Sequence, residues 1–230
     1  MKRTQLFIAF CESLKAGVKV LEAPSDATYV PIDLSVNNQE LREIDITSAA
    51  VMESYIHSKA QQKGGQVAYG GYLELRNLYQ RSRHFKNIDH PLEERNIHLG
   101  VDIWLPAGTD VLAALEGEVH SFANNAFHGD YGPTIILKHT FGYVEFYTLY
   151  GHLSLQSIPN LELGQEFKAG DKIGELGDSG VNGDYAPHLH FQVILDIQNH
   201  FGDYPGVCSQ KDLDFYMDNC PDPNMLLKLG

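Results

Sequence analysis

Two short segments of the chain carry histidines at spacings that could bring them to one metal ion. Polar and apolar residues alternate over 188–193, so His188, His190 and Gln192 share one face of a predicted strand. The two imidazoles would lie about 6.6 Å apart along the strand, so both could approach one ion or one substrate. The alternation does not say which of the two histidines is the ligand, and H-x-H by itself is a weak motif.

The second segment, 97–105, places His98, Gly100 and Asp102 on the face opposite an apolar one. A straight strand would separate the Cα atoms of His98 and Asp102 by about 13 Å, too far for both to bind one ion. A helix would shorten this distance to about 6 Å, but the strict alternation and the glycine disfavour a helix. We therefore predict a bend or bulge at Gly100 that turns His98 toward Asp102.

Two imidazoles and a carboxylate are the donor set of a catalytic zinc site, which has three protein ligands and one open position. The same donors suit non-haem Fe(II), so residue types alone leave the metal open. Iron oxygenases commonly space their first two ligands as H-x-D/E, whereas this chain has H-x-x-x-D, so iron fits less well. Other histidines are interpreted as solvated, hydrogen-bonded or structural: His57, His84, His90, His120, His128, His139 and His200.

The elements that must position these residues are mainly strands. From near Pro91 to about residue 197 the sequence consists of short alternating runs broken by glycine. Strands at this spacing predict an antiparallel sandwich or barrel-like sheet, and therefore a mainly β fold.

The N-terminal part differs in character and is expected to form an α+β extension. Thr47 or Ser48 can cap a helix that starts at Ala49, and Gly64-Gly65 can end it. The expected organisation has three parts: an extension at 1–90 with a helix near 48–63, a β domain at 91–197, and a tail at 198–230 packed on the core.

Composition excludes several classes of protein. Among 230 residues, 17 Lys and Arg against 30 Asp and Glu give a net charge of −13, which argues against binding to nucleic acid or to anionic membranes. No apolar run reaches the length of a membrane-spanning helix. Cys11, Cys208 and Cys220 are widely spaced and are expected to be reduced structural thiols, with a Cys208–Cys220 bridge left open. The oligomeric state is not indicated.

The first residues indicate a compartment only indirectly. An apolar run covers Leu6 to Cys11 and ends at Glu12, which is shorter than a secretory signal requires. The sequence therefore predicts a cytoplasmic protein, or a periplasmic or secreted one if the N-terminus has been trimmed.

Five motif blocks occur in order over about residues 95 to 195. They read HLGVD at 98–102, PAGTDV at 106–111 with GEV at 117–119, YTLYGHLS at 147–154, LGQ at 163–165 with KAGDKIG at 168–174, and PHLHF at 187–191. Together they resemble the lysostaphin-type (LytM-like) zinc metallopeptidases, whose blocks include H-x-G-x-D, Y-x-H-L and P-H-L-H-F. One block would be a weak signal, whereas five in register are a strong one.

The resemblance implies an antiparallel β core with a groove, of the duplicated hybrid motif type. It implies that Zn²⁺ is held by His98, Asp102 and His190, and that His152 and His188 act as catalytic histidines beside the metal. The implied activity is that of a zinc metalloendopeptidase that hydrolyses peptide bonds in peptidoglycan peptides or Gly-rich cross-bridges. Two alternatives stay open: a non-catalytic member that binds and activates a partner hydrolase, and a cytoplasmic metallohydrolase for another amide.

The chain departs from the family pattern near the expected groove. Many members carry Asn soon after their Tyr-Gly, where this chain has YGPT at 131–134, and the segment 182–186 replaces the usual Ser/Thr-Gly. Gln192 stands where Glu is frequent. These departures bear on substrate preference.

The first 90 residues lie outside the common core and, with the tail, resemble a subgroup found alongside aminotransferase-like domains. They could be structural or a blocking pro-segment, and a Tyr or His from 66–90 could reach the metal.

Overall fold

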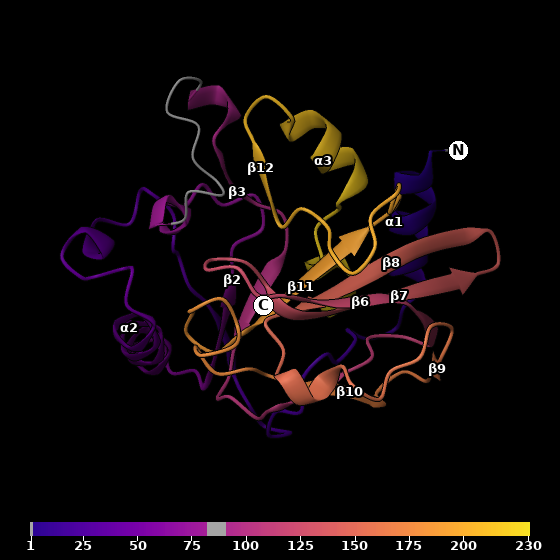
Figure 1. Cartoon of the computed structure of the whole chain (residues 1–230), viewed down its shortest axis with the longest axis horizontal. Helices are drawn as coiled ribbons and strands as arrows, with labels where there is room; N and C mark the ends of the chain where they lie inside the picture. The colour runs from indigo at the N-terminus through magenta and orange to yellow at the C-terminus, as the bar shows by residue number, and fades with distance from the viewer. Residues whose placement is uncertain (1, 82–90) are drawn as a thin grey trace.

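The computed structural model describes residues 2–81 and 91–230, so the predicted roles of His84 and His90 lie outside the described residues. The largest element is an eight-stranded sheet with the order β1-β2-β4-β11-β8-β7-β6-β9, in which every pair is antiparallel except β1–β2 (Figure 1). Its strands are β1 (Tyr29–Pro31), β2 (Val67–Gly70), β4 (Val101–Trp104), β6 (Gly117–Asn125), β7 (Gly132–Phe141), β8 (Val144–Gly151), β9 (Glu166–Phe167) and β11 (Leu189–Ile194). The prediction of a mainly β, antiparallel fold is confirmed.

Two small sheets and several short helices complete the described chain. β5 (Asp110–Leu112) pairs with β10 (Lys172–Glu175), and β3 (Arg95–His98) pairs with β12 (Val207–Ser209). The α-helices are α1 (Arg3–Ser13), α2 (Ala49–Gln62), α3 (Leu213–Asn219) and α4 (Asn224–Leu227). The 3₁₀ helices are η1 (Gln39–Arg42), η2 (Leu78–Arg81), η3 (Pro91–Glu93) and η4 (Leu155–Ser157). None of the helices in the described segments is long and apolar enough to span a membrane.

Both faces of the central strands are buried. Because successive side chains of a strand point to opposite faces, Phe146 and Tyr150 enter one cluster, while Leu149 enters another. Phe7 of α1 lies against the first face, with its ring 5.0 Å from that of Phe146. Tyr204, from the C-terminal tail, is fully buried against the second face. The C-terminal tail therefore packs on the core and contributes a buried side chain to it.

The N-terminal extension is continuous with the main sheet. Ser48 caps α2 by accepting from the backbone N–H of Val51, as the sequence predicts, and Met52 and Ile56 are buried one turn apart. β2 pairs with β4, so a strand of the extension lies directly beside a strand that carries a candidate metal ligand. Figure 1 shows α2 and α1 on opposite sides of the molecule, so the extension borders the sheet at two places.

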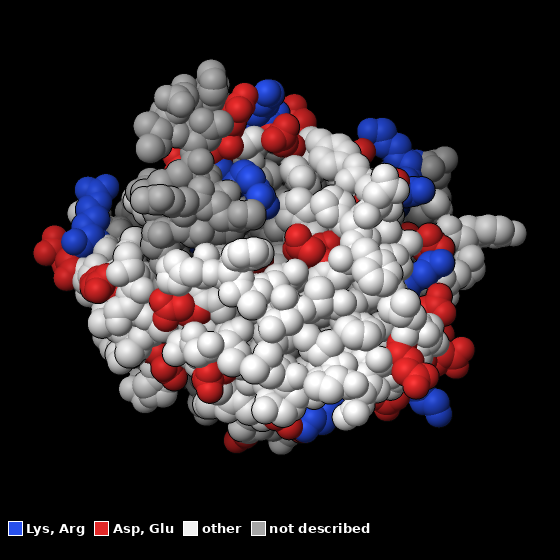
Figure 2. Space-filling model, in the orientation of Figure 1, with Lys and Arg blue, Asp and Glu red and all other residues white. Residues whose placement is uncertain are grey.

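The distribution of basic side chains and the state of the three cysteines agree with what the sequence predicts. Among the described residues on the face shown in Figure 2, Lys and Arg side chains are scattered and form no broad basic surface, while much of the middle is uncharged. Cys11, Cys208 and Cys220 are all free and buried. Burial raises the pKa of each of the three thiols to about 12, which keeps them protonated.

Candidate metal centre

The chain changes sheets between His98 and Asp102. β3 ends at His98 and pairs in a two-stranded sheet, whereas β4 begins at Val101 in the main sheet. This break at Leu99-Gly100 brings His98 Nε2 to 3.2 Å from Asp102 Oδ1. The structure therefore has the interruption at Gly100 that the sequence predicts, and the two side chains meet although they are four residues apart.

Strand register brings the third donor to the same place. On β11, His190 is opposite Asp102 of β4 on one side and Gly151 of β8 on the other, and residues opposite one another in a sheet point to the same face. Gly100 makes room for the His190 ring, because a Cβ at residue 100 would lie 2.6 Å from the ring carbon Cε1. β8 ends at Gly151, and the next residue, His152, leaves the strand with a φ of 64° and has its ring centroid 6.3 Å from that of His190.

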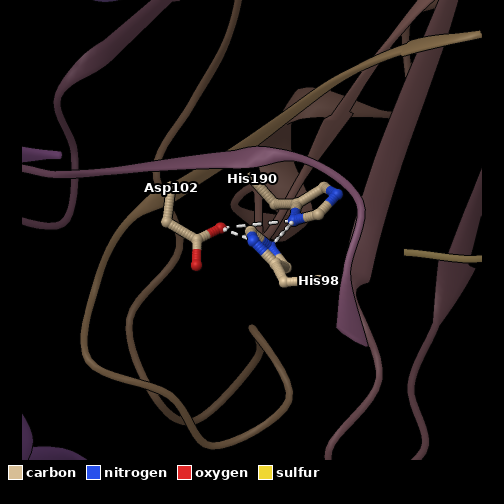
Figure 3. Close-up of side chains that lie close together, drawn as sticks. All are labelled: His98, Asp102 and His190. Carbon is tan, nitrogen blue, oxygen red and sulfur yellow. Dashed lines mark hydrogen bonds and ion pairs between the residues drawn. The ribbon is translucent and has the colours of Figure 1, made fainter. Parts of the chain in front are cut away.

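Three donor atoms converge on one point (Figure 3). His98 Nε2 lies 2.9 Å from His190 Nδ1, and each of these nitrogens lies 3.2 Å from Asp102 Oδ1. Ligands about 2.0–2.1 Å from a tetrahedral zinc ion stand roughly 3.3 Å from one another, so the observed triangle is close to the size that zinc requires. All three residues are buried. The donor set and its geometry fit a zinc ion held by His98, Asp102 and His190.

In each candidate ligand, the side-chain atom that faces away from this point makes a hydrogen bond to a neighbouring residue. His98 Nδ1 donates to the Gly71 carbonyl at 2.9 Å, and His190 Nε2 donates to Gln192 Oε1 at 2.9 Å. Asp102 Oδ2 accepts from Arg76 Nη1 at 2.6 Å. These bonds assign the imidazole protons to the outer nitrogens, because a carbonyl or amide oxygen can only accept. His98 Nε2 and His190 Nδ1 therefore direct lone pairs at the point where the three donor atoms converge, and partners behind metal ligands usually have this effect.

His152 and His188 lie beside the cluster. Their ring centroids are 4.2 Å apart, and His188 Nε2 lies 3.7 Å from Asp102 Oδ1. His152 Nδ1 donates to the Asn182 carbonyl and His188 Nδ1 donates to the Ala186 carbonyl, both at 2.7 Å. Each ring therefore keeps its Nε2 free of a proton, in a form that can accept one.

The backbone of His152 is unusual. Its φ of 64° is in the left-handed region, which a non-glycine residue rarely occupies. Its N–H donates to the Tyr131 carbonyl and its carbonyl accepts from the Gly177 N–H, both at 2.9 Å, so the neighbouring loops hold this conformation. Strained backbone of this kind is concentrated at functional sites.

Burial and charge set the protonation of the cluster. Burial lowers the pKa of His98 to about 4, with the Arg76 charge as a second cause, and it lowers the pKa of His152 and His188 below the usual 6.5. Burial alone would raise the pKa of Asp102, but the neighbouring His98 and Arg76 bring it well below 3.8. Near neutral pH, His98, His152 and His188 are neutral and the carboxylate is ionised, which is the state that binds a cation.

A cavity of about 230 Å³ opens at this cluster. Its lining combines the extension, including Met52 and Ile56 of α2, with the β domain and the tail. Trp104 stacks on His188, with ring centroids 5.8 Å apart at 24°. The five residues expected from the sequence, His98, Asp102, His152, His188 and His190, all line this one cavity.

Several neighbours of the site belong to no sequence motif. Arg76 and Gly71 hold two of the ligands but lie more than 20 residues before them. Tyr131 packs its ring 5.1 Å from that of His190, with its hydroxyl 3.4 Å from Nε2. Tyr79 also lines the cavity, and its hydroxyl lies 3.4 Å from Nη1 of Arg76. No sequence pattern links these residues to the histidines, although the YGPT departure did point to the loop of Tyr131.

Residues 96–200 match the model of peptidase family M23, and the chain carries a domain of this family, of the LytM or lysostaphin type. Among curated proteins it is similar to the peptidoglycan DD-endopeptidase ShyC of Vibrio cholerae, at 33% identity over 46% of this chain and 22% of that one. It is also similar to the murein hydrolase activator NlpD of Escherichia coli, at 34% identity over 41% and 22%. The chain thus spans about a fifth of the length of these two relatives.

Among solved structures, the catalytic domain of lysostaphin from Staphylococcus simulans is 27% identical, with a TM-score of 0.37 over 53% of this chain and 80% of that one.

Proposed function

We propose that this chain is a zinc metalloendopeptidase that hydrolyses peptide bonds in peptidoglycan peptides or Gly-rich cross-bridges. The observation that carries the proposal is the triangle of donor atoms on His98, Asp102 and His190, with sides of 2.9, 3.2 and 3.2 Å. Peptidoglycan is proposed as the substrate because relatives are named for action on peptidoglycan or murein.

Zinc held by these three residues would supply a water activated near neutral pH and would polarise the scissile carbonyl. The chain itself supplies the proton transfers. His152 and His188 present unprotonated Nε2 atoms beside the cluster, since their Nδ1 protons are donated to carbonyls. Either ring can accept a proton at Nε2 and return it to the leaving amine, and the protonated ring can stabilise a developing oxyanion.

This activity requires the cell envelope as its working place. We therefore propose a periplasmic or secreted location, the alternative expected for a trimmed N-terminus. The cytoplasmic location predicted from the first residues gains no support from the relatives.

A non-catalytic activator is the second candidate, because NlpD is named as a hydrolase activator. The set of metal-ligand positions distinguishes an activator from an enzyme, because members that only bind a partner usually lose one or more ligands. This chain keeps all three ligand residues and both extra histidines. Occupied ligand positions favour catalysis.

The test combines metal analysis with digestion of purified peptidoglycan and short peptides, with and without chelator. Chelator-sensitive release of new amines from peptidoglycan supports the proposal. Bound zinc with no turnover of any substrate favours the activator, and turnover of non-wall amides alone favours the metallohydrolase of another amide.

A further inference from the structure

Arg76 is a buried cation in the N-terminal extension, 20 residues before the part of the chain that matches the family. Its side chain is 2% exposed. Nη1 donates to Asp102 Oδ2 and Nε donates to Glu74 Oε2, each at 2.6 Å, so one guanidinium bridges two carboxylates. Within the described residues, Nη2 is the one buried side-chain nitrogen or oxygen that lacks a hydrogen-bond partner.

This arrangement is a poor way to stabilise a fold. A buried ion pair must compensate the loss of hydration of both charges, and apolar side chains of similar volume often serve stability as well or better. The unpartnered Nη2 adds to that cost. A contribution to stability therefore does not explain the arginine, whereas control of the Asp102 carboxylate does.

Strand register brings the segment that contains Arg76 next to the candidate metal centre. Gly70 of β2 is directly opposite Asp102 of β4, so the turn that follows β2 runs along the candidate metal ligands. Gly71 in this turn has a φ of 104° and accepts from His98 through its carbonyl, and an added Cβ there would collide with the Arg76 guanidinium. The segment 71–76 after β2 thus carries both the carbonyl that holds His98 and the arginine that holds Asp102.

Glu74 ties this turn to the rest of the extension. Its Oε2 accepts from Arg76, and its Oε1 accepts from the backbone N–H of Leu34 at 2.9 Å. The chain of contacts from Leu34 through Glu74 and Arg76 to Asp102 fixes which carboxylate oxygen faces the histidines.

We infer that Arg76 is a positioning residue of the metal centre: it holds Asp102 by Oδ2 so that Oδ1 faces the two histidines. The extension then completes the centre, and is not a segment that merely precedes or blocks it. This inference rests on the proposed zinc site.

The test is Arg76→Lys, measured by zinc affinity in a competition titration and by the visible spectrum of the Co²⁺-loaded chain. Lysine keeps the positive charge, so the electrostatic effect on a bound cation is preserved, but its single ammonium cannot reproduce the planar fork between two carboxylates. Loss of a partner behind a ligand typically weakens metal binding about 10- to 100-fold, and we expect a loss in that range with a changed cobalt spectrum. The matched control is Arg95→Lys: Arg95 borders the same cavity but donates to the Val207 carbonyl, so zinc affinity should stay within twofold of the parent.

The outcomes separate this inference from the zinc site itself. If the parent chain binds no zinc, the proposed metal centre is wrong and the inference falls with it. If the parent binds zinc and Arg76→Lys binds it equally well with the same cobalt spectrum, only the positioning role is overturned.

If Arg76→Lys does not fold, the variant Glu74→Gln tests the positioning role of Arg76 instead. Glutamine keeps the acceptor for Leu34 and leaves Arg76 in place, but removes one of the charges that orient it. At least threefold weaker zinc binding supports the inference, and unchanged binding overturns it.

Discussion

Replacing Gly100 with alanine places a methyl group against the ring of His190. The added Cβ would lie 2.6 Å from Cε1, 2.7 Å from Nε2 and 2.8 Å from the backbone oxygen of Phe191. Ordinary contacts of a Cβ begin near 3.4 Å, so the ring must retreat by about 0.8 Å. The strand cannot share this movement easily, because the Phe191 oxygen belongs to β11, which is paired on both sides.

The size of the effect follows from the tolerance of metal coordination. Ligand distances in zinc sites vary by only about 0.2 Å, so a ring displaced by about 0.8 Å no longer presents Nδ1 at bonding distance without further rearrangement. We expect zinc affinity to fall about 10- to 100-fold, which corresponds to about 1.4 to 2.8 kcal/mol. Overpacking of this kind also lowers the free energy of unfolding by about 1 to 3 kcal/mol.

The assay is competition of Gly100→Ala with a chromophoric chelator for zinc, accompanied by urea unfolding. Gly108→Ala is the matched control, because Gly108 has a φ of 83° with nothing within 4 Å of an added Cβ. It should lose stability through backbone strain and keep its zinc affinity. Parental zinc affinity in Gly100→Ala would refute the argument that this glycine exists to admit the His190 ring.

Further predictions concern the ligands, the catalytic histidines and a buried histidine away from the site. Asp102→Ala removes one of three ligands and should abolish zinc retention on dialysis, so full zinc occupancy by metal analysis would show that the assignment is wrong. His152→Asn and His188→Asn should keep zinc and lower peptide hydrolysis about 10²- to 10⁴-fold, measured by amine release, and equal loss of zinc and activity would instead indicate a ligand role. Burial lowers the pKa of His139 to about 4 from about 6.5 in the unfolded chain, so the unfolded chain binds the extra proton first as the pH falls. Stability present above pH 6.5 is therefore lost toward pH 4, by about 2 to 3 kcal/mol at pH 4.5, as urea unfolding at several pH values would show. His139→Gln should reduce this pH dependence by the His139 share, while the buried His98, His152 and His188 keep theirs, and an unchanged slope would exclude His139 as a contributor.

Local patterns were sufficient for the strands and for the ligand segments. The alternation over 188–193 depends only on the two-residue period of a strand, and it placed His188 and His190 on one face whatever the rest of the chain does. The break at Gly100 could be predicted for the same kind of reason, since 98–102 could not chelate as a straight strand. The helix near 48–63 was predicted from a Thr47 or Ser48 cap and a glycine stop, which are also local signals, and the observed helix is Ala49–Gln62 with Ser48 as the cap.

Contacts between distant strands were outside the reach of these patterns. The tail was expected to pack on the core, but its prolines and short apolar runs do not indicate which residue enters the core, and Tyr204 is buried against the β8 face that carries Leu149. Its burial depends on the sheet being assembled first. The same holds for Tyr131, whose ring reaches His190 only because β7 and β8 bring the preceding loop alongside β11.

The outer contacts of the metal centre illustrate why a motif identifies ligands more readily than what holds them. Metal ligands must be of a few residue types and lie on a few short strands and turns, so their spacing can be recognised in the sequence. Their partners need only one correctly placed acceptor or donor. Here the partners come from separate places: the segment after β2 for His98 and Asp102, and Gln192, two residues further along β11, for His190. The register between β2 and β4 sets Gly70 opposite Asp102, and this brings Arg76 of the extension next to the candidate metal centre. If the β2–β4 pairing were shifted by one residue, the segment after β2 would lie on the other face of the sheet. Asp102 would then be buried without the Arg76 guanidinium.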